Sequence, residues 1–598
     1  MNHLLSTADA EMRHFLEGLR DLVLTEMEAQ RQQISDQWRK PLSTRVADGY
    51  AIEGVRVSEI RTDGKVELTC PRNVSRFRPG DVLCLSHDDP FFAGNPMLTL
   101  DEDEETKLIV SSELPVAWDQ LSAHQEPWTL DIGFVDLSSY IISALVEAGD
   151  TRVGRERILP LLMQRVQPDI DPVLYAHGLA LGEERALNWS QSEALANAYA
   201  TDLAYLVQGP PGTGKTRVLA TLARALVQNG ERVLVCAFTH RAINNALNAI
   251  ARFNPGVPAI KVGDPTRADD LRVKNYETFH ESPLADEGGG YIVGATPFAT
   301  RTRRLGGVAF DTIIFDEASQ ITLPLAIMGM LAGQKYVFFG DQKQLPPVLT
   351  TRMTGGAFRE SVFGTLVDGN FDTMLTETYR LNDALAGWPS RQFYDGLLTS
   401  APQAAGGRIQ YHAPPRRLDD VLAPHEPKVF WDLGHHNHTT YCHQEASAVV
   451  DLITTLLACG TPAAEIGVVA PYRAQGRLLR NMLRAYVPEP AIRRQLVVDT
   501  VERMQGQERD LIILSLTTSN PGFAANVAEF FFQPERLNVA ITRPRYKLII
   551  VGSRFVLNAQ PFDAAFAAMV DLLDDLLTSC KYIPLTQDIS PQVWESEW

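Results

Sequence analysis

The segment GPPGTGKT, residues 209–216, decides the fold expected for this 598-residue chain. It satisfies the pattern GxxxxGK[ST] and lies between an apolar run, AYLVQ, and a helical stretch, VLATLARALVQ, which is the context that a phosphate-binding loop requires. Its glycines let backbone N–H groups surround phosphate oxygens at a helix N-terminus. We expect Lys215 to reach the β- and γ-phosphates of ATP and Thr216 to place its hydroxyl on Mg²⁺. The loop residues expected to bind ATP are Gly209, Pro210, Pro211, Gly212, Thr213, Gly214, Lys215 and Thr216. The alternative, a chance match in a glycine-rich turn, does not explain these flanks.

Two polar segments follow apolar runs downstream of this loop. TIIFDEAS ends an apolar run in Asp316 and Glu317. We expect Asp316 to hold Mg²⁺, mostly through water, and Glu317 to act as general base on the attacking water. In YVFFGDQKQLPP, the amide of Gln344 could contact both the γ-phosphate and that water, although an ordinary turn explains this segment equally well.

Apolar runs alternate with helical segments through the rest of the chain. The runs are YLVQ, RVLVCAF, TIIFDEA, YVFFGD, IGVVAPY, LIILSL and KLIIVG. They are apolar on both faces, as buried parallel strands are, and their alternation with helices predicts α/β layers. Because the pattern recurs on both sides of a glycine-containing break near residues 350–358, we expect two α/β domains in tandem.

The N-terminal part has a different pattern. Residues 8–38 place apolar side chains at helical spacing, which predicts one amphipathic helix. Residues 45–115 contain short β-rich runs and a hairpin signal, Asp63-Gly64, which predict a small antiparallel barrel or sandwich. The acidic run 101–105 is expected to be a solvated loop. The predicted divisions are a helical stalk (1–44), a β-barrel accessory domain (45–125), a first P-loop domain (126–350) and a second α/β domain (351–598).

Charge and cysteine content bound the environment. The net charge of −18 argues against broad adhesion to nucleic acid, but it does not exclude a local basic groove. No run of 18 apolar residues occurs, so no membrane span is expected. The six cysteines form no CxxC pair, which is typical of a protein from a reducing cytoplasm.

Two arginines in the second half have the chemistry to complete a phosphate site. Arg380 lies in TETYRLN and Arg543 in RLNVAITRPR. Phosphoryl transfer builds charge on the γ-phosphate oxygens, and the planar fork of an arginine from outside the P-loop domain can stabilise it. On the residues alone, a surface ion pair is the simpler explanation for either arginine.

In order and wording these segments resemble the superfamily 1 helicases. The nearest branch is the 5′-to-3′ one that includes the nonsense-mediated-decay RNA helicase and the helicase half of flap-processing nuclease-helicases. The resemblance covers about residues 187–554 and rests on LNWSQ, FTHRAINNAL, FDEAS, GDQKQLPP, ETYRLN, APYRAQ, DTVERMQGQERDLIILS and RLNVAITRPR. It implies two RecA-like domains with a stalk and barrel as accessory parts. It also implies a motor that uses ATP and Mg²⁺ between those domains to move along single-stranded DNA or RNA.

The resemblance also implies roles for matching positions. Gln191 would read the adenine edge, Glu508 would lie near the ribose, and Tyr379 would line the nucleotide cleft. Arg380 and Arg543 would be the γ-phosphate arginines of the second domain. The positions that would face the nucleic acid are Thr239, Asn244, Thr296, Tyr472 and Thr500. No nuclease motif precedes the motor, so a nuclease is not supported.

Some questions stay open on the sequence. The chain could instead be a nucleotide-gated switch or scaffold in a larger complex, without useful unwinding. The loop GHHNHTTYCHQEA (434–446) carries metal-capable side chains at His435, His436, His438, Cys442 and His443, but their spacing matches no zinc pattern, and a variable loop is the simpler interpretation. The stalk, the barrel or the C-terminal VWESEW could dock a protein partner, although a packed tail is favoured, and the motor is expected to be monomeric.

Overall fold

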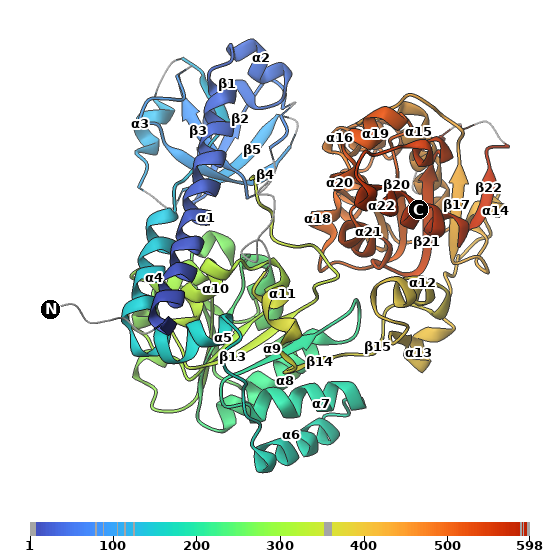
Figure 1. Cartoon of the computed structure of the whole chain (residues 1–598). Coiled ribbons are helices and arrows are strands. Elements are labelled where there is room, and N and C mark those ends of the chain that lie inside the picture. The colour runs from blue at the N-terminus through green and yellow to red at the C-terminus, as the bar shows by residue number, and fades with distance from the viewer. Residues whose placement is uncertain are drawn as a thin grey trace.

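The computed structural model describes residues 7–594 except 74, 78–79, 88, 105, 113–114, 124–125, 269, 352–360, 587–588 and 590. Figure 1 shows a barrel raised above the first α/β domain on a helical stalk, with the second α/β domain beside both. This is the predicted fold class: tandem RecA-like domains with a stalk and a barrel. Among the described residues, no helix is both long and apolar enough to span a bilayer.

The stalk is a pair of helices rather than a single one. The predicted long helix is α1 (Thr7–Trp38), and α4 (Ser138–Asp150) returns alongside it after the barrel. Leu19 of α1 and Leu145 of α4 are buried in the same hydrophobic core as the sheet of the first domain. The indole Nε1 of Trp38 donates to the carbonyl of Ile132 at 2.8 Å, so the chain enters and leaves the barrel at adjacent points.

The barrel is closed and antiparallel, in the order β1-β2-β5-β4-β3-β6. Its strands are β1 (Ala51–Ile60), β2 (Val66–Thr69), β3 (Val82–Ser86), β4 (Met97–Asp103), β5 (Lys107–Ser111) and β6 (Trp128–Ile132), with α2 (Leu42–Ala47) before them and α3 (Trp118–Ser122) before β6. The predicted boundary at residue 125 is wrong, because β6 pairs with β1 and β3 and closes the barrel. The acidic run is not wholly a solvated loop: Asp101 lies in β4 and forms an ion pair with Arg267 at 2.9 Å.

The first domain has an eight-stranded parallel sheet in the order β10-β9-β11-β8-β12-β13-β7-β14. The strands are β7 (Ala204–Gln208), β8 (Arg232–Cys236), β9 (Ala259–Val262), β10 (Lys274–Tyr276), β11 (Tyr291–Ala295), β12 (Thr312–Phe315), β13 (Lys335–Gly340) and β14 (Asp372–Met374). Its helices are α5 (Leu159–Leu162), α6 (Pro172–Glu184), α7 (Trp189–Ala200), α8 (Lys215–Gln228), α9 (His240–Phe253), α10 (Leu323–Met330) and α11 (Val362–Leu366). The predicted boundary at residue 350 is too early, because β14 pairs with β7. Most of the predicted break, residues 352–358, lies outside the described residues.

The second domain has a six-stranded parallel sheet in the order β19-β18-β20-β21-β17-β22. The strands are β17 (Lys428–Asp432), β18 (Ile466–Val469), β19 (Val497–Asp499), β20 (Arg509–Ser515), β21 (Pro544–Gly552) and β22 (Lys581–Pro584). Its helices are α12 (Asp383–Phe393), α13 (Pro402–Ala405), α14 (Asp419–Leu422), α15 (His443–Ala458), α16 (Arg473–Tyr486), α17 (Pro490–Gln495), α18 (Val501–Met504), α19 (Pro521–Asn526), α20 (Ala528–Phe531), α21 (Pro534–Ile541) and α22 (Ala564–Thr578). A small pair, β15 (Glu377–Thr378) and β16 (Thr399–Ser400), joins the two domains. In the tail, the backbone N–H of Trp594 donates to the Tyr486 carbonyl at 2.7 Å, and Trp594 packs on the core of this domain.

Candidate nucleotide cleft and nucleic-acid face

The phosphate-binding loop joins β7 to α8 and depends on glycine at two positive-φ positions. Gly214, at φ +81°, is the N-cap of α8, and Gly212 lies at φ +75°. A Cβ atom on Gly212 would lie only 2.4 Å from Cβ of Arg380. The loop therefore needs glycine both for its own turn and for the close approach of the second domain's chain.

Lys215, Asp316 and Glu317 form a charge cluster at one wall of the cleft. The ammonium of Lys215 lies 3.1 Å from Glu317 Oε1 and 3.5 Å from Asp316 Oδ1. Burial disfavours the charged ammonium, but the two carboxylates outweigh it and raise the pKa of Lys215. Burial raises the pKa of Asp316, and Lys215 opposes that shift. Lys215 is thus paired with two carboxylates in this structure. A bound phosphate would replace the carboxylates as partner of Lys215, and its metal ion would replace Lys215 as partner of the carboxylates.

Gln344 and Arg543 meet across the cleft from opposite domains. Nη2 of Arg543 donates to Oε1 of Gln344 at 3.4 Å, and Nε donates to the Val539 carbonyl at 2.8 Å. Burial lowers the pKa of Arg543, and nearby Arg380 adds to the shift. A guanidinium that is 2% exposed and close to another cation, on the wall of a nucleotide cleft, is arranged to receive an anion.

Arg380 lies in the same cleft but is held by Glu508. Its Nε donates to Glu508 Oε2 at 2.7 Å, and its Nη1 donates to the Thr542 carbonyl at 3.1 Å. Burial raises the pKa of Glu508, but Arg380 and then Arg545 lower it by more. Glu508, predicted to lie near the ribose, thus serves in this structure as the counter-ion of Arg380.

Except for Asp316, which lies behind Lys215 and Glu317, these charged and amide side chains line one cleft of about 430 Å³. Its lining residues are Gly209, Pro210, Pro211, Gly212, Thr213, Gly214, Lys215, Thr216, Arg217, Arg252, Phe253, Glu317, Gln344, Tyr379, Arg380, Gly506, Glu508 and Arg543. Both α/β domains contribute to it. The sequence did not predict the four lining residues Arg217, Arg252, Phe253 and Gly506.

Gln191, for which the resemblance implies a contact with the adenine edge, is bonded to the phosphate-binding loop in this structure. It is 1% exposed, is not among the lining residues, and its Nε2 donates to the Thr213 carbonyl at 2.9 Å. Its Oε1 accepts from the backbone of Asn188, whose side chain accepts in return from the backbone of Gln191. This reciprocal pair is a capping box at the start of α7, so the Gln191 amide bonds both the phosphate-binding loop and its own helix N-terminus, and its contact with adenine stays a prediction.

The chain that links the two domains is bonded directly to the phosphate-binding loop. The hydroxyl of Thr378 donates to the Pro211 carbonyl at 2.8 Å, and the backbone N–H of Tyr379 donates to the Gly212 carbonyl at 2.8 Å. The hydroxyl of Tyr379, which does line the cleft, accepts from Asn188 Nδ2 at 2.9 Å. A backbone contact of this kind has no signal in the sequence.

A buried polar network joins the Gln344 loop to the second domain. Asp341 Oδ2 accepts from Gln344 Nε2 and from the Tyr394 hydroxyl, both at 2.8 Å. That hydroxyl accepts from Asn538 Nδ2 at 2.8 Å, and Asn538 also donates to the Lys343 carbonyl at 2.8 Å. The network ties the loop beside the cleft to α12 and α21.

Four of the five positions expected to face the nucleic acid follow a parallel strand. Thr239 comes after β8 and caps α9, Thr296 comes after β11, and Tyr472 comes after β18 at the start of α16. Thr500 comes after β19 but is only 5% exposed. Asn244 instead donates to the Arg267 carbonyl at 3.1 Å. The structure therefore places Thr239, Thr296 and Tyr472 at the carboxyl ends of their sheets and gives Asn244 an internal contact.

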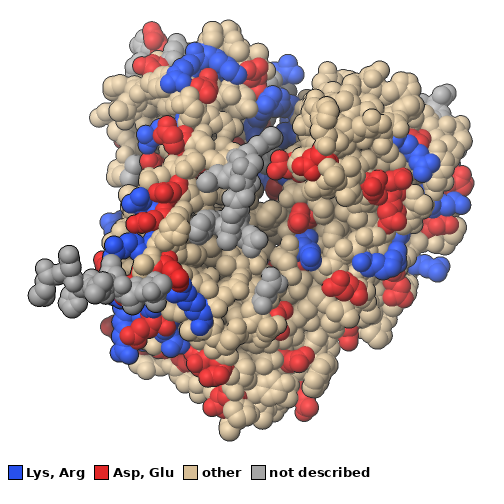
Figure 2. All heavy atoms as spheres, viewed as in Figure 1, with Lys and Arg blue, Asp and Glu red and all other residues tan. Residues whose placement is uncertain are grey.

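Arginines gather where the barrel meets the second domain. Arg473 Nη1 donates to the Arg76 carbonyl at 2.7 Å, and Arg477 Nη2 donates to the Ser75 carbonyl at 2.8 Å. Burial lowers the pKa of Arg477, and Arg480, Arg76 and Arg473 lower it further. Figure 2 shows basic side chains gathered along the hollow between the barrel and the second domain. We call Arg76, Arg473, Arg477 and Arg480 the arginine wall.

Two family models, both described as an AAA domain, match most of the two α/β domains. One matches residues 186–287 and 290–352, and the other matches residues 358–555. Together they cover more than half of the chain and contain both walls of the cleft. The chain belongs to the superfamily 1 helicases.

Similar proteins share only part of their length with this helicase. The "DNA replication ATP-dependent helicase/nuclease DNA2" of Saccharomyces cerevisiae is 27% identical over 72% of this chain and 30% of its own length. The "DNA polymerase alpha-associated DNA helicase A" of Schizosaccharomyces pombe is 27% identical over 65% of this chain and 67% of its own. The "Regulator of nonsense transcripts 1 homolog" of Neurospora crassa is 29% identical over 62% and 37%. The chain thus spans between 30% and 67% of the length of these relatives.

Among solved structures, the helicase matches the arterivirus nonstructural protein 10 helicase with a TM-score of 0.39 and 13% identity. That match covers 89% of this chain and 82% of the viral one.

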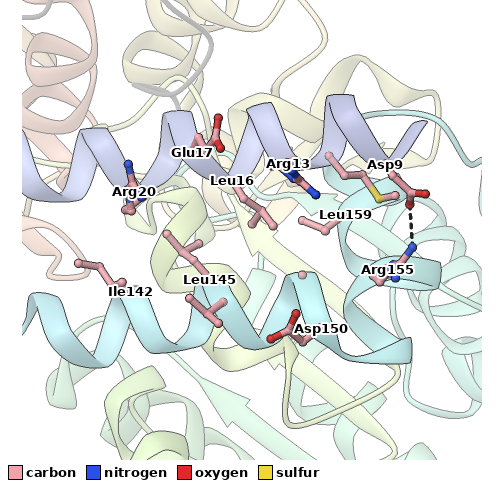
Figure 3. Close-up of a pocket in the computed structure, with 13 residues that line it drawn as sticks. Asp9, Arg13, Leu16, Glu17, Arg20, Ile142, Leu145, Asp150, Arg155 and Leu159 are labelled. Atoms are coloured by element: carbon pink, nitrogen blue, oxygen red, sulfur yellow. Dashed lines mark hydrogen bonds and ion pairs between the residues drawn. The ribbon is translucent and has the colours of Figure 1, made fainter. Parts of the chain in front are cut away.

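The helicase has a second cavity, of about 380 Å³, between α1 and α4 (Figure 3). Leu16, Leu145 and Leu159 form apolar walls, and an ion pair between Asp9 and Arg155, at 2.7 Å, closes one end. None of its lining residues is shared with the nucleotide cleft. The cavity is therefore a feature of the stalk and not part of the ATP site.

Proposed function

We propose that the protein is an ATP-dependent translocase that moves along single-stranded DNA or RNA, in the 5′-to-3′ direction, and unwinds duplexes ahead of it. The observation that carries this proposal is the cleft itself. Lys215 and Glu317 of the first domain and Arg380 and Arg543 of the second line one space, and Gln344 bonds Arg543 across it. Because both domains contribute to the site, a bound nucleotide favours the closed arrangement of the two domains, and its loss favours the open one.

The residues present fit ATP with Mg²⁺. Thr216 lines the cleft, and the buried carboxylate of Asp316 lies 3.5 Å from the Lys215 ammonium; Mg²⁺ prefers few protein oxygens because it keeps several waters. When bound, Mg²⁺ would neutralise charge on the β- and γ-phosphates. Lys215 would leave its carboxylate partners and bind those phosphates.

The chain's own groups would then act in turn. Glu317 accepts a proton from the attacking water, and Gln344 orients that water through its amide. Arg543 and Arg380 donate to the γ-phosphate oxygens as charge develops on them. Loss of the γ-phosphate removes its bonds to Arg380 and Arg543, which weakens the hold of the second domain on the first and favours opening of the cleft.

The arginine wall supports a nucleic-acid grip despite the net charge of −18. Clustered cations bind a phosphate backbone without reading its sequence. Their affinity falls as the salt concentration rises, because the release of counterions from the nucleic acid then becomes less favourable. Aromatic side chains lie at the same face: Tyr472 stacks on Phe531 at 6.2 Å between ring centroids. We also propose a monomer, because one chain supplies both walls of the cleft, and a cytoplasmic location, which the six buried free thiols support.

The test is the ATPase rate of the full chain alone, with poly(dT) and with poly(U). We expect stimulation by at least one polymer, loss of hydrolysis in Lys215→Ala, and normal stimulation in Lys274→Ala, which changes an exposed lysine on the edge strand β10. Hydrolysis that neither polymer stimulates would favour the alternative, a nucleotide-gated switch or scaffold. Duplexes with only a 5′ or only a 3′ overhang would then give the direction.

A further inference from the structure

Three metal-capable side chains converge in the loop between β17 and α15 of the second domain. One ligand atom each from His435, His438 and Cys442 lies within 4.8 Å of the others. His435 and Cys442 are buried, at 4% and 0% exposure, and His438 is half-buried. These three side chains form a compact N₂S donor set, and none of them lines the nucleotide cleft.

The neighbouring histidines do not belong to this set. The ring of His436 packs edge-on against Phe555 with centroids 4.8 Å apart, and the ring of His443 lies against Tyr441 at 5.9 Å. The rings of His435 and His438, by contrast, are 5.3 Å apart. Only some of the metal-capable residues of this loop therefore point at one place.

His435 has the kind of support that metal-bound histidines have. Its Nε2 bonds Glu445 Oε2 at 2.9 Å, and its Nδ1 bonds the hydroxyl of Ser519 at 2.9 Å. Glu445 is fully buried and held in place, since its Oε1 accepts from the Ser515 hydroxyl at 2.5 Å and from the Thr517 N–H at 2.7 Å. A carboxylate behind a histidine fixes the orientation of the ring and makes it a better ligand.

The loop backbone is fixed as well. The carbonyl of His438 accepts from the backbone N–H groups of Ser519 and Asn520 at 2.9 and 3.0 Å. Cys442 is the N-cap of α15, and its sulfur accepts from the Glu445 N–H at 3.4 Å. The N-cap position therefore holds the sulfur of Cys442 in place beside the two histidines.

We propose that His435, His438 and Cys442 bind one Zn²⁺ ion. Two imidazoles and a thiolate are ligands that zinc prefers, and three protein ligands leave the fourth tetrahedral position to water. Nδ1 of His435 exchanges its bond with Ser519 for the metal while Nε2 keeps Glu445. Cys442 releases its thiol proton to solvent when the ion binds.

The position of this site gives it a structural consequence. The hydroxyl of Thr518 donates to the Thr439 carbonyl at 2.7 Å and lies within hydrogen-bonding distance, 3.3 Å, of the Tyr472 hydroxyl. Zinc would therefore stabilise the loop that contains Thr439 and, through Thr518, the position of Tyr472, which stacks on Phe531. The zinc site itself does not depend on the proposed motor function.

The test measures metal on the full chain, purified without an affinity tag from zinc-supplemented medium and kept reduced with a non-chelating reagent. We expect about one zinc per chain by elemental analysis, and a thiolate-to-cobalt absorption band when Co²⁺ replaces it. Cys442→Ser and His438→Gln should lose both signals. Serine is itself a strong N-cap, so Cys442→Ser should keep α15 folded, which circular dichroism and the ATPase rate check.

His436→Gln and Cys459→Ser are the matched controls, since they remove a histidine and a cysteine that lie outside the set. Both should keep zinc and the cobalt band, and zinc should raise the melting temperature of the wild type and of these controls only. The proposal fails if the wild type binds neither metal at micromolar concentration. It fails equally if folded Cys442→Ser binds zinc as the wild type does.

Discussion

Replacing Arg543 with alanine tests the central claim about the cleft. The guanidinium is 2% exposed, lines the cleft, and lies 3.4 Å from Gln344 Oε1, so a γ-phosphate bound to Lys215 would face it directly. Arg543→Ala leaves every contact of the phosphate-binding loop in place. The variant should therefore still bind ATP but should hydrolyse it slowly.

The magnitude follows from the bonds that are lost. A planar guanidinium can give the γ-phosphate two charge-assisted hydrogen bonds, each worth about 1.5–3 kcal/mol. Their loss costs about 3–6 kcal/mol of transition-state stabilisation, which lowers kcat by roughly 10²–10⁴. Arg543→Lys keeps a charge without the fork, so its rate should lie between those of alanine and wild type.

The assay is kcat at saturating ATP and saturating poly(dT) or poly(U), with ATP affinity measured separately from a fluorescent analogue. Arg554→Ala is the control, because it removes an exposed arginine that lies over the Tyr582 ring in the same domain. Thermal melts show whether each variant is folded. If folded Arg543→Ala kept kcat within about threefold of wild type, the two-domain cleft would not be the site of hydrolysis.

Three further changes test other parts of the structure. Glu317→Gln should bind ATP and lower kcat by about 10²–10⁴, the usual contribution of a general base, and near-normal turnover would refute that role. Glu26→Gln on α1 should lower the free energy of unfolding at pH 7 by about 1–3 kcal/mol, because Glu26 accepts from Thr350 and Thr351. Burial raises the pKa of Glu26, but these bonds lower it overall, so its stabilisation is complete above the unfolded pKa near 4.5 and disappears as pH falls through the lower folded pKa. Urea unfolding at pH 7 and in acid should therefore show the gap between wild type and variant narrowing in acid, and a constant gap would contradict it. Arg45→Met should cost about 3–5 kcal/mol in the same measurement, because it removes the cation that lies 2.9 Å from the buried carboxylate of Asp131. A cost below about 1 kcal/mol would mean that this pair is hydrated.

The sequence was enough to predict the strands that have long apolar runs. All seven quoted runs are strands of the two parallel sheets, because a strand buried on both faces must be apolar at every position. Strands of three residues, such as β10, β14 and β19, carry too few positions to show such a pattern. Two of the three predicted domain boundaries were wrong for a related reason. β14 pairs with β7, and β6 pairs with β1 and β3, which lie far from them in the sequence, so only the pairing assigns these strands to their sheets.

The residues of the candidate site likewise fall into those whose positions the sequence predicted and those whose positions it did not. Lys215, Glu317, Gln344, Arg380 and Arg543 all line the cleft, since their motifs fix both the residue type and its place in the chain. Gln191 does not, although the N-x-x-Q spacing from Asn188 was a readable capping-box signal. The bond from Thr378 to the phosphate-binding loop was not readable at all, because its acceptor is a backbone carbonyl.

The paired helices of the stalk have a mechanical consequence. Because α1 and α4 share a hydrophobic core with the first domain, the barrel is anchored to that domain through two packed helices. The second domain touches the barrel through Arg473 and Arg477, and it touches the first domain through Arg543 and Gln344. A rotation of the second domain that widens the nucleotide cleft would therefore also move Arg473 and Arg477 away from Arg76 and Ser75 of the barrel. Opening of the cleft and the contact between the second domain and the barrel are coupled through these bonds.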